Sequence, residues 1–241
     1  MTDSPNSNRV AKLDGLIDSL KPFSNLQERS EVYVGPIPEI ADFAITLYST
    51  LANAIDPNAT RVHEIQDVTF RRHITFANRS IIVALVSSIE YFMQSYCQRS
   101  HIQVHPLYVR KAKKLLDRCD PYLGVELRSW VKSMAAGGNA TISDYSEAML
   151  SAKNATDILK RDWRSFISII TVLRNKGAHG GAELATSDLT KIRAVRNEYD
   201  FEGELGYALS EGGELGVPLS FLPWALRKLQ ALADELDGHI G

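Results

Sequence analysis

Residues 70–98, FRRHITFANRSIIVALVSSIEYFMQSYCQ, carry the strongest helical pattern in the chain. Their large apolar residues recur three, four or seven positions apart, a spacing that puts them on one face of an α-helix. The residues of this stripe are Ile74, Ile81, Leu85, Ile89, Phe92 and Tyr96. Other apolar residues flank the stripe, so we expect a long central helix that is buried on several sides.

The same periodicity predicts shorter helices on either side of this one. They cover residues 10–20, 40–55, 106–119, 123–134, 143–150, 156–175, 187–198 and 220–236. We expect the first of them to stop at Pro22, because proline disfavours helical continuation. In residues 202–219, glycines separate short alternating stretches around a turn at 210–214, which predicts a β-hairpin. The expected fold is an all-α helical bundle with a small β-hairpin near the C-terminus.

The composition is that of an ordinary soluble globular protein, with 241 residues, 44% of them hydrophobic and 23% charged. We expect a disordered leader at 1–8, an N-terminal helical elaboration at 9–60 and a helical domain at 61–241. No run approaches the roughly 20 apolar residues of a membrane-spanning helix, and we expect no secretion signal at the N-terminus. Two isolated cysteines, Cys97 and Cys119, suit a reducing cytoplasm.

A net charge of −2 conceals an uneven distribution of charge along the chain. Residues 61–196 hold 21 basic and 12 acidic side chains, whereas residues 197–241 hold 2 basic and 9 acidic ones. A basic centre with acidic ends suits a protein that offers one face to a polyanion. Charge alone favours the simpler interpretation that any helical protein carries solvated charged faces.

Several common kinds of catalytic site are absent from the sequence. It contains no glycine-rich phosphate loop, no nucleophile elbow and no helical HExxH zinc motif. His101 and His105 lie four residues apart, which on a helix could direct two imidazoles at one metal ion. Pro106 follows at once and no third ligand is nearby, so we expect two surface histidines in a connection. We therefore expect neither a metal nor a cofactor.

A second apolar helix ends in polar residues that suit phosphate chemistry. Residues 169–180 read IITVLRNKGAHG, so Arg174 falls in the last turn and Gly177 suits a left-handed residue just beyond the helix. After this bend the chain presents His179. Arginine offers a permanent cation and a planar donor fork for phosphate, and histidine can move protons near neutral pH. Metal-free RNA cleavage requires these groups.

The sequence Arg174-Asn175-(Lys176-Gly177-Ala178)-His179 resembles the motif of the HEPN superfamily. In that motif an arginine, a polar residue, a short spacer and a histidine stand at the end of a late core helix. Residues 81–92 resemble the long partner helix of the family, and Glu90 matches its acidic residue near the middle. The resemblance covers about residues 70–180, with weaker similarity in the final helix. The first 60 residues and the hairpin look like elaborations of a minimal HEPN bundle.

The resemblance implies a metal-independent endoribonuclease that works as a homodimer with one composite active site. It implies that His179 acts as general base or acid and that Arg174 binds the scissile phosphate. Asn175 would hold the loop or contact the phosphate, and Glu90 would orient the basic groups. RNA is expected to contact the basic residues Lys176, Arg71, Arg72, Arg110, Lys113 and Lys114. Many such nucleases are prokaryotic toxins or anti-phage defence effectors, so an antitoxin or a defence-system protein is a further expected partner.

Two other interpretations remain open from the sequence. A catalytically silent HEPN module would keep the fold in order to bind RNA, a nucleotide or a protein partner. Retention of both Arg174 and His179 argues against it, since a purely structural module needs neither. A helical enzyme of unrelated chemistry would need a metal or nucleophile cluster, and the sequence shows none. Without the family pattern, Arg174 would be read as a helix-capping arginine and His179 as a turn histidine.

Overall fold

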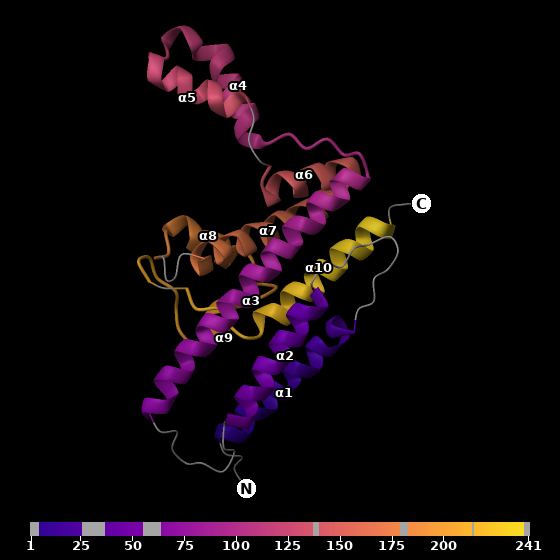
Figure 1. Ribbon diagram of the computed structural model, residues 1–241, viewed down its shortest axis with the longest axis vertical. Coiled ribbons are helices and arrows are strands. Elements are labelled where there is room, and N and C mark those ends of the chain that lie inside the picture. The colour runs from indigo at the N-terminus through magenta and orange to yellow at the C-terminus, as the bar shows by residue number, and fades with distance from the viewer. Residues whose placement is uncertain are drawn as a thin grey trace. The chain divides into compact units, whose positions relative to one another are not determined.

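The computed structural model describes residues 5–25, 37–54, 64–136, 140–178, 183–213 and 215–238, although the side chains of 64–75 and a few others lie outside the description. Within these ranges the chain forms helices and no β-strand, in agreement with the predicted all-α class (Figure 1). The helices are α1 (Pro5–Ser24), α2 (Ile37–Ala54), α3 (Glu64–Arg99), α4 (Leu107–Cys119), the 3-10 turn η1 (Asp120–Tyr122), α5 (Val125–Ala136), α6 (Ile142–Ala152), α7 (Asp157–Ala178), α8 (Thr186–Ala194), α9 (Phe201–Leu205) and α10 (Phe221–Gly238).

The chain divides into two compact units. The first unit joins Met1–Ile89 to Ser168–Gly241, and the second consists of Glu90–Ile167. The boundaries between the units fall within two helices. Helix α3 passes from the first unit into the second after Ile89, and α7 returns to the first unit after Ile167. This grouping puts α1 and α2 in the same unit as α10.

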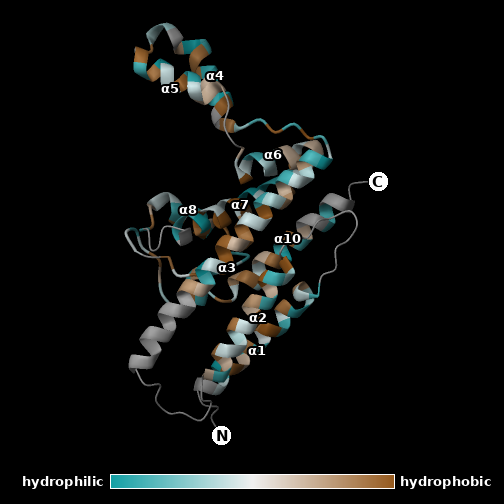
Figure 2. Ribbon diagram, in the orientation of Figure 1, coloured by the Kyte–Doolittle hydropathy of each residue, from teal (hydrophilic) through white to brown (hydrophobic). Residues whose placement is uncertain are grey.

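The core of the first unit contains an aromatic cluster beneath α10. Rings of Tyr199, Phe201, Phe221 and Trp224 lie with centroids 4.8–5.5 Å apart. The hydroxyl of Tyr48 on α2 donates to the carbonyl of Leu219, at 2.9 Å, which ties α2 to the segment before α10. Figure 2 shows hydrophobic and hydrophilic residues alternating along α1, α2 and α10, as expected of helices with one buried face.

Helix α1 is longer at both ends than the sequence predicted. It begins at Pro5, a favoured residue in the first turn, so residues 5–8 of the predicted leader are helical. It also continues through Pro22 to Ser24. Proline this close to the end removes only one backbone hydrogen bond, and the burial of Leu20 and Phe23, which are 0% and 4% exposed, offsets that loss.

The predicted β-hairpin at 202–219 is not confirmed in the described residues. Phe201–Leu205 is helix α9, which takes the place of the first expected strand. The expected turn does form, with Gly212 at φ 75°, a conformation that favours glycine. Its partner, however, is Leu184, which donates to the carbonyl of Gly213 and accepts from the N–H of Gly212, both at 2.9 Å. A distant segment therefore occupies the backbone groups that a local hairpin would have used.

The second unit contains the helical pair α4–α5 and the well-capped helix α6. The N-cap of α6, predicted from residue 143, is Thr141, and Asp144 completes a capping box with it. By length and composition alone, Phe76–Arg99 of α3 could cross a membrane. This is weak evidence, because 56% of its most apolar window is buried and core helices pass the same test.

Candidate functional site

The candidate site is built at the end of α7, whose start and apolar face follow the predicted pattern. The hydroxyl of Thr156 accepts from the N–H of Leu159 at 3.3 Å, and Asp157 lies in the first turn, where its charge suits the helix dipole. The apolar stripe is buried, and Ile170 and Leu173 are 0% and 1% exposed. This buried stripe fixes the rotation of α7, and thereby the direction of the polar residues that follow Leu173.

Helix α7 does not end where the sequence predicted. It continues through Gly177 to Ala178, so Gly177 is helical and the predicted left-handed bend at this residue is wrong. The contacts of Lys176 join this last turn to the segment that leads into α8. Positions two apart on a helix differ by about 200° around its axis, so Arg174 leaves α7 on a different face from Lys176.

The side chain of Lys176 is held by the segment that leads into α8. Its ammonium lies 3.1 Å from a carboxylate oxygen of Asp188, and the two side chains are only 18% and 14% exposed. It also donates a hydrogen bond to the carbonyl oxygen of Glu183. Lys176 was predicted to bind RNA, but these contacts favour a structural role at the junction of α7 and α8.

Asp188 caps the start of α8 and also binds a side chain of α7. One of its oxygens accepts from the N–H of Ala185, the N-cap residue of α8, at 3.0 Å, and the same oxygen pairs with Lys176. Burial alone would raise the pKa of Asp188. The hydrogen bonds from Ala185 and Lys176, with Lys191 nearby, hold that pKa below its usual value instead. The carboxylate therefore stays ionised and keeps the junction closed near neutral pH.

The other predicted residues of the motif are placed only in part. Arg174 is half-buried and has contacts within the chain, and Asn175 is exposed on the last turns of α7. His179 follows Ala178 directly and lies outside the described residues. Arg71 and Arg72 belong to the helical backbone of α3, but their side chains also lie outside the description. The proximity of His179 to Arg174 thus stays a prediction.

Glu90 belongs to the second unit, whereas Arg174 belongs to the first. Within its own unit Glu90 lies near Tyr145 of α6. Burial raises the pKa of Tyr145, and the negative charges of Cys97 and Glu90 add to that effect. The predicted contact between Glu90 and the motif stays a prediction.

The three basic residues predicted on α4 are exposed. Arg110, Lys113 and Lys114 project from this amphipathic helix, whose Ala112 is 5% exposed. In the same unit Arg164 is already engaged, because its guanidinium binds both carboxylate oxygens of Glu147, at 2.6 and 2.8 Å. Among the described residues, no group of three or more His, Cys, Asp or Glu side chains could hold a metal ion.

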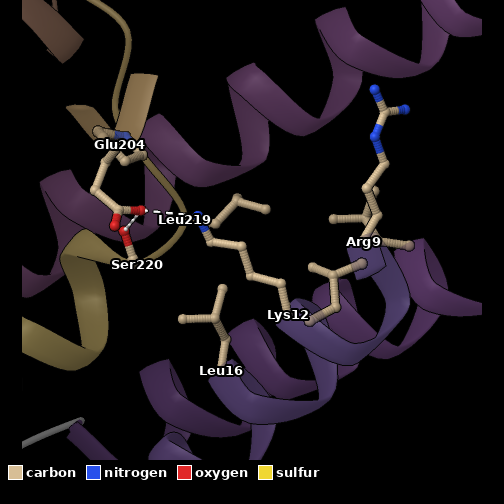
Figure 3. Close-up of a pocket in the computed structure, with 9 residues that line it drawn as sticks. Arg9, Lys12, Leu16, Glu204, Leu219 and Ser220 are labelled. Carbon is tan, nitrogen blue, oxygen red and sulfur yellow. Dashed lines mark hydrogen bonds and ion pairs between the residues drawn. The ribbon is translucent and has the colours of Figure 1, made fainter. Parts of the chain in front are cut away.

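A small pocket of about 270 Å³ lies elsewhere in the first unit, between α1, α2 and the segment before α10. Its wall is mostly apolar and includes Leu13, Leu16 and Leu51. Figure 3 shows Lys12 reaching across to Glu204, at 3.1 Å, while the hydroxyl of Ser220 donates to the same carboxylate at 2.7 Å. These contacts fasten α1 to the C-terminal part of the unit.

Comparison of the chain with protein-family models, with curated proteins and with solved structures gave no match. The site therefore has to be argued from its own residues. The sequence pattern missed Asp188, although an aspartate three residues after an N-cap position is a signal that could have found it. It had no local signal for Lys12, Glu204 and Ser220, because the contact of Lys12 with Glu204 spans 192 residues and that of Ser220 with Glu204 spans 16.

Proposed function

We propose that this protein is a metal-independent endoribonuclease of the HEPN type. The observation that carries the proposal is the position of Arg174, which stands near the end of α7, a helix whose apolar stripe is buried. Its neighbour Asn175 is exposed, and His179 follows the helix after Ala178. A rigid helix that presents an arginine beside a histidine-bearing segment is suited to binding and cleaving a phosphodiester.

The junction of α7 and α8 supports this proposal by fixing both ends of the segment that carries His179. Before the segment, Lys176 binds Asp188 and the carbonyl of Glu183. After it, Leu184 is 1% exposed and pairs with the turn at Gly212. Catalytic groups need closely defined positions, and these contacts hold the described residues on either side of His179.

The proposed reaction is cleavage by the ribose 2′-hydroxyl. One imidazole takes the proton of this hydroxyl, and its oxygen attacks the phosphorus atom. Arg174 stabilises the charge on the phosphate oxygens while the bond from phosphorus to the 5′-oxygen breaks. A second acid protonates the leaving 5′-oxygen. The products are a 2′,3′-cyclic phosphate and a 5′-hydroxyl end.

A homodimer would supply the second acid. In the proposed dimer the motifs of two chains meet at a two-fold axis, so His179 and the partner's His179 share the roles of base and acid. The biological role that suits such an enzyme is that of a toxin or an anti-phage defence effector, acting on RNA in the cytoplasm. An antitoxin or another defence protein would then control it.

The test is cleavage of total RNA and of tRNA in EDTA by wild type, His179→Ala and Arg174→Ala. We expect only the wild type to cleave, and its products to carry 2′,3′-cyclic phosphate ends. Arg227→Ala is the matched control, because Arg227 is exposed on α10 in the same unit and has no side-chain partner among the described residues. This variant should cleave as wild type does.

Cleavage that persists in both motif variants would contradict the proposal and place the chemistry elsewhere. Absence of cleavage by the wild type as well as by both motif variants would favour the alternative, a silent HEPN module that binds RNA, a nucleotide or a protein partner. The observation favouring that alternative is the engagement of Lys176, since a basic residue of the motif is used to hold the fold. Analytical ultracentrifugation of wild type tests the proposed homodimer separately.

A further inference from the structure

An open hollow lies in the second unit. It has a volume of about 550 Å³, within the range of roughly 300–1,000 Å³ that is typical of small-molecule sites. It is lined by residues of the connection between α3 and α4, of α4 itself and of α6. Its polar lining consists of His101, Gln103, His105, Arg110, Asp144, Glu147 and Ser151.

Protein groups already satisfy both carboxylates of this hollow. Asp144 accepts from the N–H and the hydroxyl of Thr141, at 2.9 and 2.7 Å, and from the N–H of Leu107 at 2.8 Å. Glu147 is bound by both nitrogens of the Arg164 fork. Their oxygens therefore have little capacity left for a ligand, and the adjacent cations Arg110 and Arg164 balance their charge.

In this hollow, the side chains that can still donate hydrogen bonds to a ligand include two imidazoles and one guanidinium. The side chains of His101, His105 and Arg110 make no hydrogen bond or ion pair with any other residue that the structure describes. Each of them can donate hydrogen bonds, and Arg110 does so as a permanent cation. Ser151 adds a hydroxyl to the lining. This set of donors is suited to an anion.

The backbone fixes the position of His101. Helix α3 ends with the N–H of Ile102 bonded to the carbonyl of Cys97 at 2.8 Å, which leaves His101 at φ 53° in the left-handed region. Glycine is the usual residue at this position of a helix end. A histidine here puts an imidazole at the mouth of the hollow at some conformational cost.

We propose that this hollow binds the phosphate group of a nucleotide-sized ligand through His101, His105 and Arg110. Arginine presents a planar fork that matches two phosphate oxygens, and the imidazoles supply donors from the connection opposite. The hollow is much larger than a phosphate ion, so its apolar wall at Ile102, Ala148 and Ala152 has room for the remainder of the molecule. The site is independent of the proposed ribonuclease motif.

The test is calorimetric titration of the full chain with adenosine monophosphate, adenosine and inorganic phosphate. We expect saturable binding of the monophosphate, with adenosine at least about tenfold weaker. Arg110→Gln and His105→Gln should each weaken binding of the monophosphate by about tenfold, since each removes a hydrogen bond to a charged group. His101→Asn is the suitable third variant, because asparagine tolerates the left-handed backbone.

Arg118→Gln is the matched control on α4, because it removes an exposed guanidinium that does not line the hollow. It should change the affinity by less than about twofold. Equal binding of adenosine and its monophosphate overturns the proposal. So does a loss that is as large in Arg118→Gln as in Arg110→Gln, or an absence of binding to wild type.

The phosphate could belong to a free nucleotide or to the end of an RNA strand. To separate these two sources, the affinity of a short 2′-O-methyl RNA is measured with a 5′-phosphate and with a 5′-hydroxyl end. This RNA cannot be cleaved by 2′-hydroxyl attack. A gain in affinity from the 5′-phosphate that Arg110→Gln abolishes assigns the site to RNA ends. Binding of the monophosphate without that gain assigns it to a free nucleotide. Because the probes are not cleaved, neither result depends on the nuclease proposal.

Discussion

Helices α6 and α8 begin alike, with an aspartate three residues after the N-cap position, but the two aspartates are partnered differently. Asp144 of α6 accepts hydrogen bonds from uncharged donors, including the backbone N–H of Leu107 in α4. Asp188 of α8 accepts one backbone N–H and forms an ion pair with Lys176 of α7. In each case a capping residue of one helix also fastens a second helix.

The two helix starts differ in the residues that stabilise them. The N-cap of α6 is Thr141, whose hydroxyl takes part in the cap. The N-cap of α8 is Ala185, which has no side-chain oxygen to bond the first turn. The α8 junction must therefore rely on Lys176, a residue of the candidate motif. We infer that the fold and the proposed site are coupled at α8 and separable at α6.

The largest expected effect is at α6. Asp144→Ala removes the acceptor of three hydrogen bonds at a residue that is 8% exposed, and should lower the free energy of unfolding by about 2–3 kcal/mol. Urea denaturation followed by circular dichroism measures it. Asp117→Ala on exposed α4 is the control and should change stability by less than about 0.5 kcal/mol. A loss at Asp144 no larger than this control would show that the cap contributes little.

A smaller effect is expected at the α7–α8 junction. Lys176→Met should cost about 1–2 kcal/mol, because it leaves the half-buried carboxylate of Asp188 without its cation. A double-mutant cycle with Asp188→Asn should give a coupling energy of about 1 kcal/mol. Lys176 was first predicted to bind RNA, and the same variant decides between the two roles. Unchanged stability together with weaker RNA binding would favour the RNA-binding role.

A gain of stability is expected where α8 lacks a capping side chain. Ala185→Ser supplies the missing hydroxyl and should raise the free energy of unfolding by about 0.5–1 kcal/mol. Ala194→Ser, at the other end of α8, introduces the same group where no N–H needs it. Thermal unfolding of the two variants compares them directly, and an equal response would rule out capping as the cause.

The smallest expected effect is the change in the free energy of unfolding with pH. Burial opposes ionisation of both aspartates, yet their hydrogen bonds hold the pKa of Asp144 and of Asp188 below the usual value. Their contribution is therefore complete above the unfolded pKa of about 3.9, and is lost as the pH falls through the lower folded values. Below about pH 4, wild type should lose stability more steeply than Asp144→Asn/Asp188→Asn. Parallel curves for the two proteins would contradict this assignment.

The helices could be predicted because their information is local. Apolar spacing located α3 and α7, and the helix predicted from residue 156 begins at Asp157, with Thr156 as its cap. Local information also misled, because the helix predicted from residue 143 begins at Ile142 and is capped by Thr141, which Asp144 identifies. The turn at Gly212 was predictable from glycine, whereas its pairing with Leu184 was not, because no pattern links segments so far apart.

The residues of the candidate motif were chosen from their order in the sequence, and their role stays a prediction. The contacts that support the motif were not predictable. The ion pair between Lys176 and Asp188 spans twelve residues and depends on where α7 ends, which the glycine at 177 led us to misplace. The hollow lined by His101, His105 and Arg110 depends on how α6 packs near the connection. The sequence predicted only that the two histidines lie at the surface of a connection, which is confirmed.

The discontinuous first unit also sets an order of events during synthesis. Residues 90–167 leave the ribosome as a complete unit, whereas residues 1–89 must wait for residues 168–241 before their own unit can close. At roughly 5–20 residues per second, translating the 78 residues in between takes about 4–16 seconds. Throughout that interval the apolar faces of α1 and α2 lack their C-terminal partners, which makes them sites for chaperones. The arginine at the end of α7 joins a folded unit only after α10 has been made.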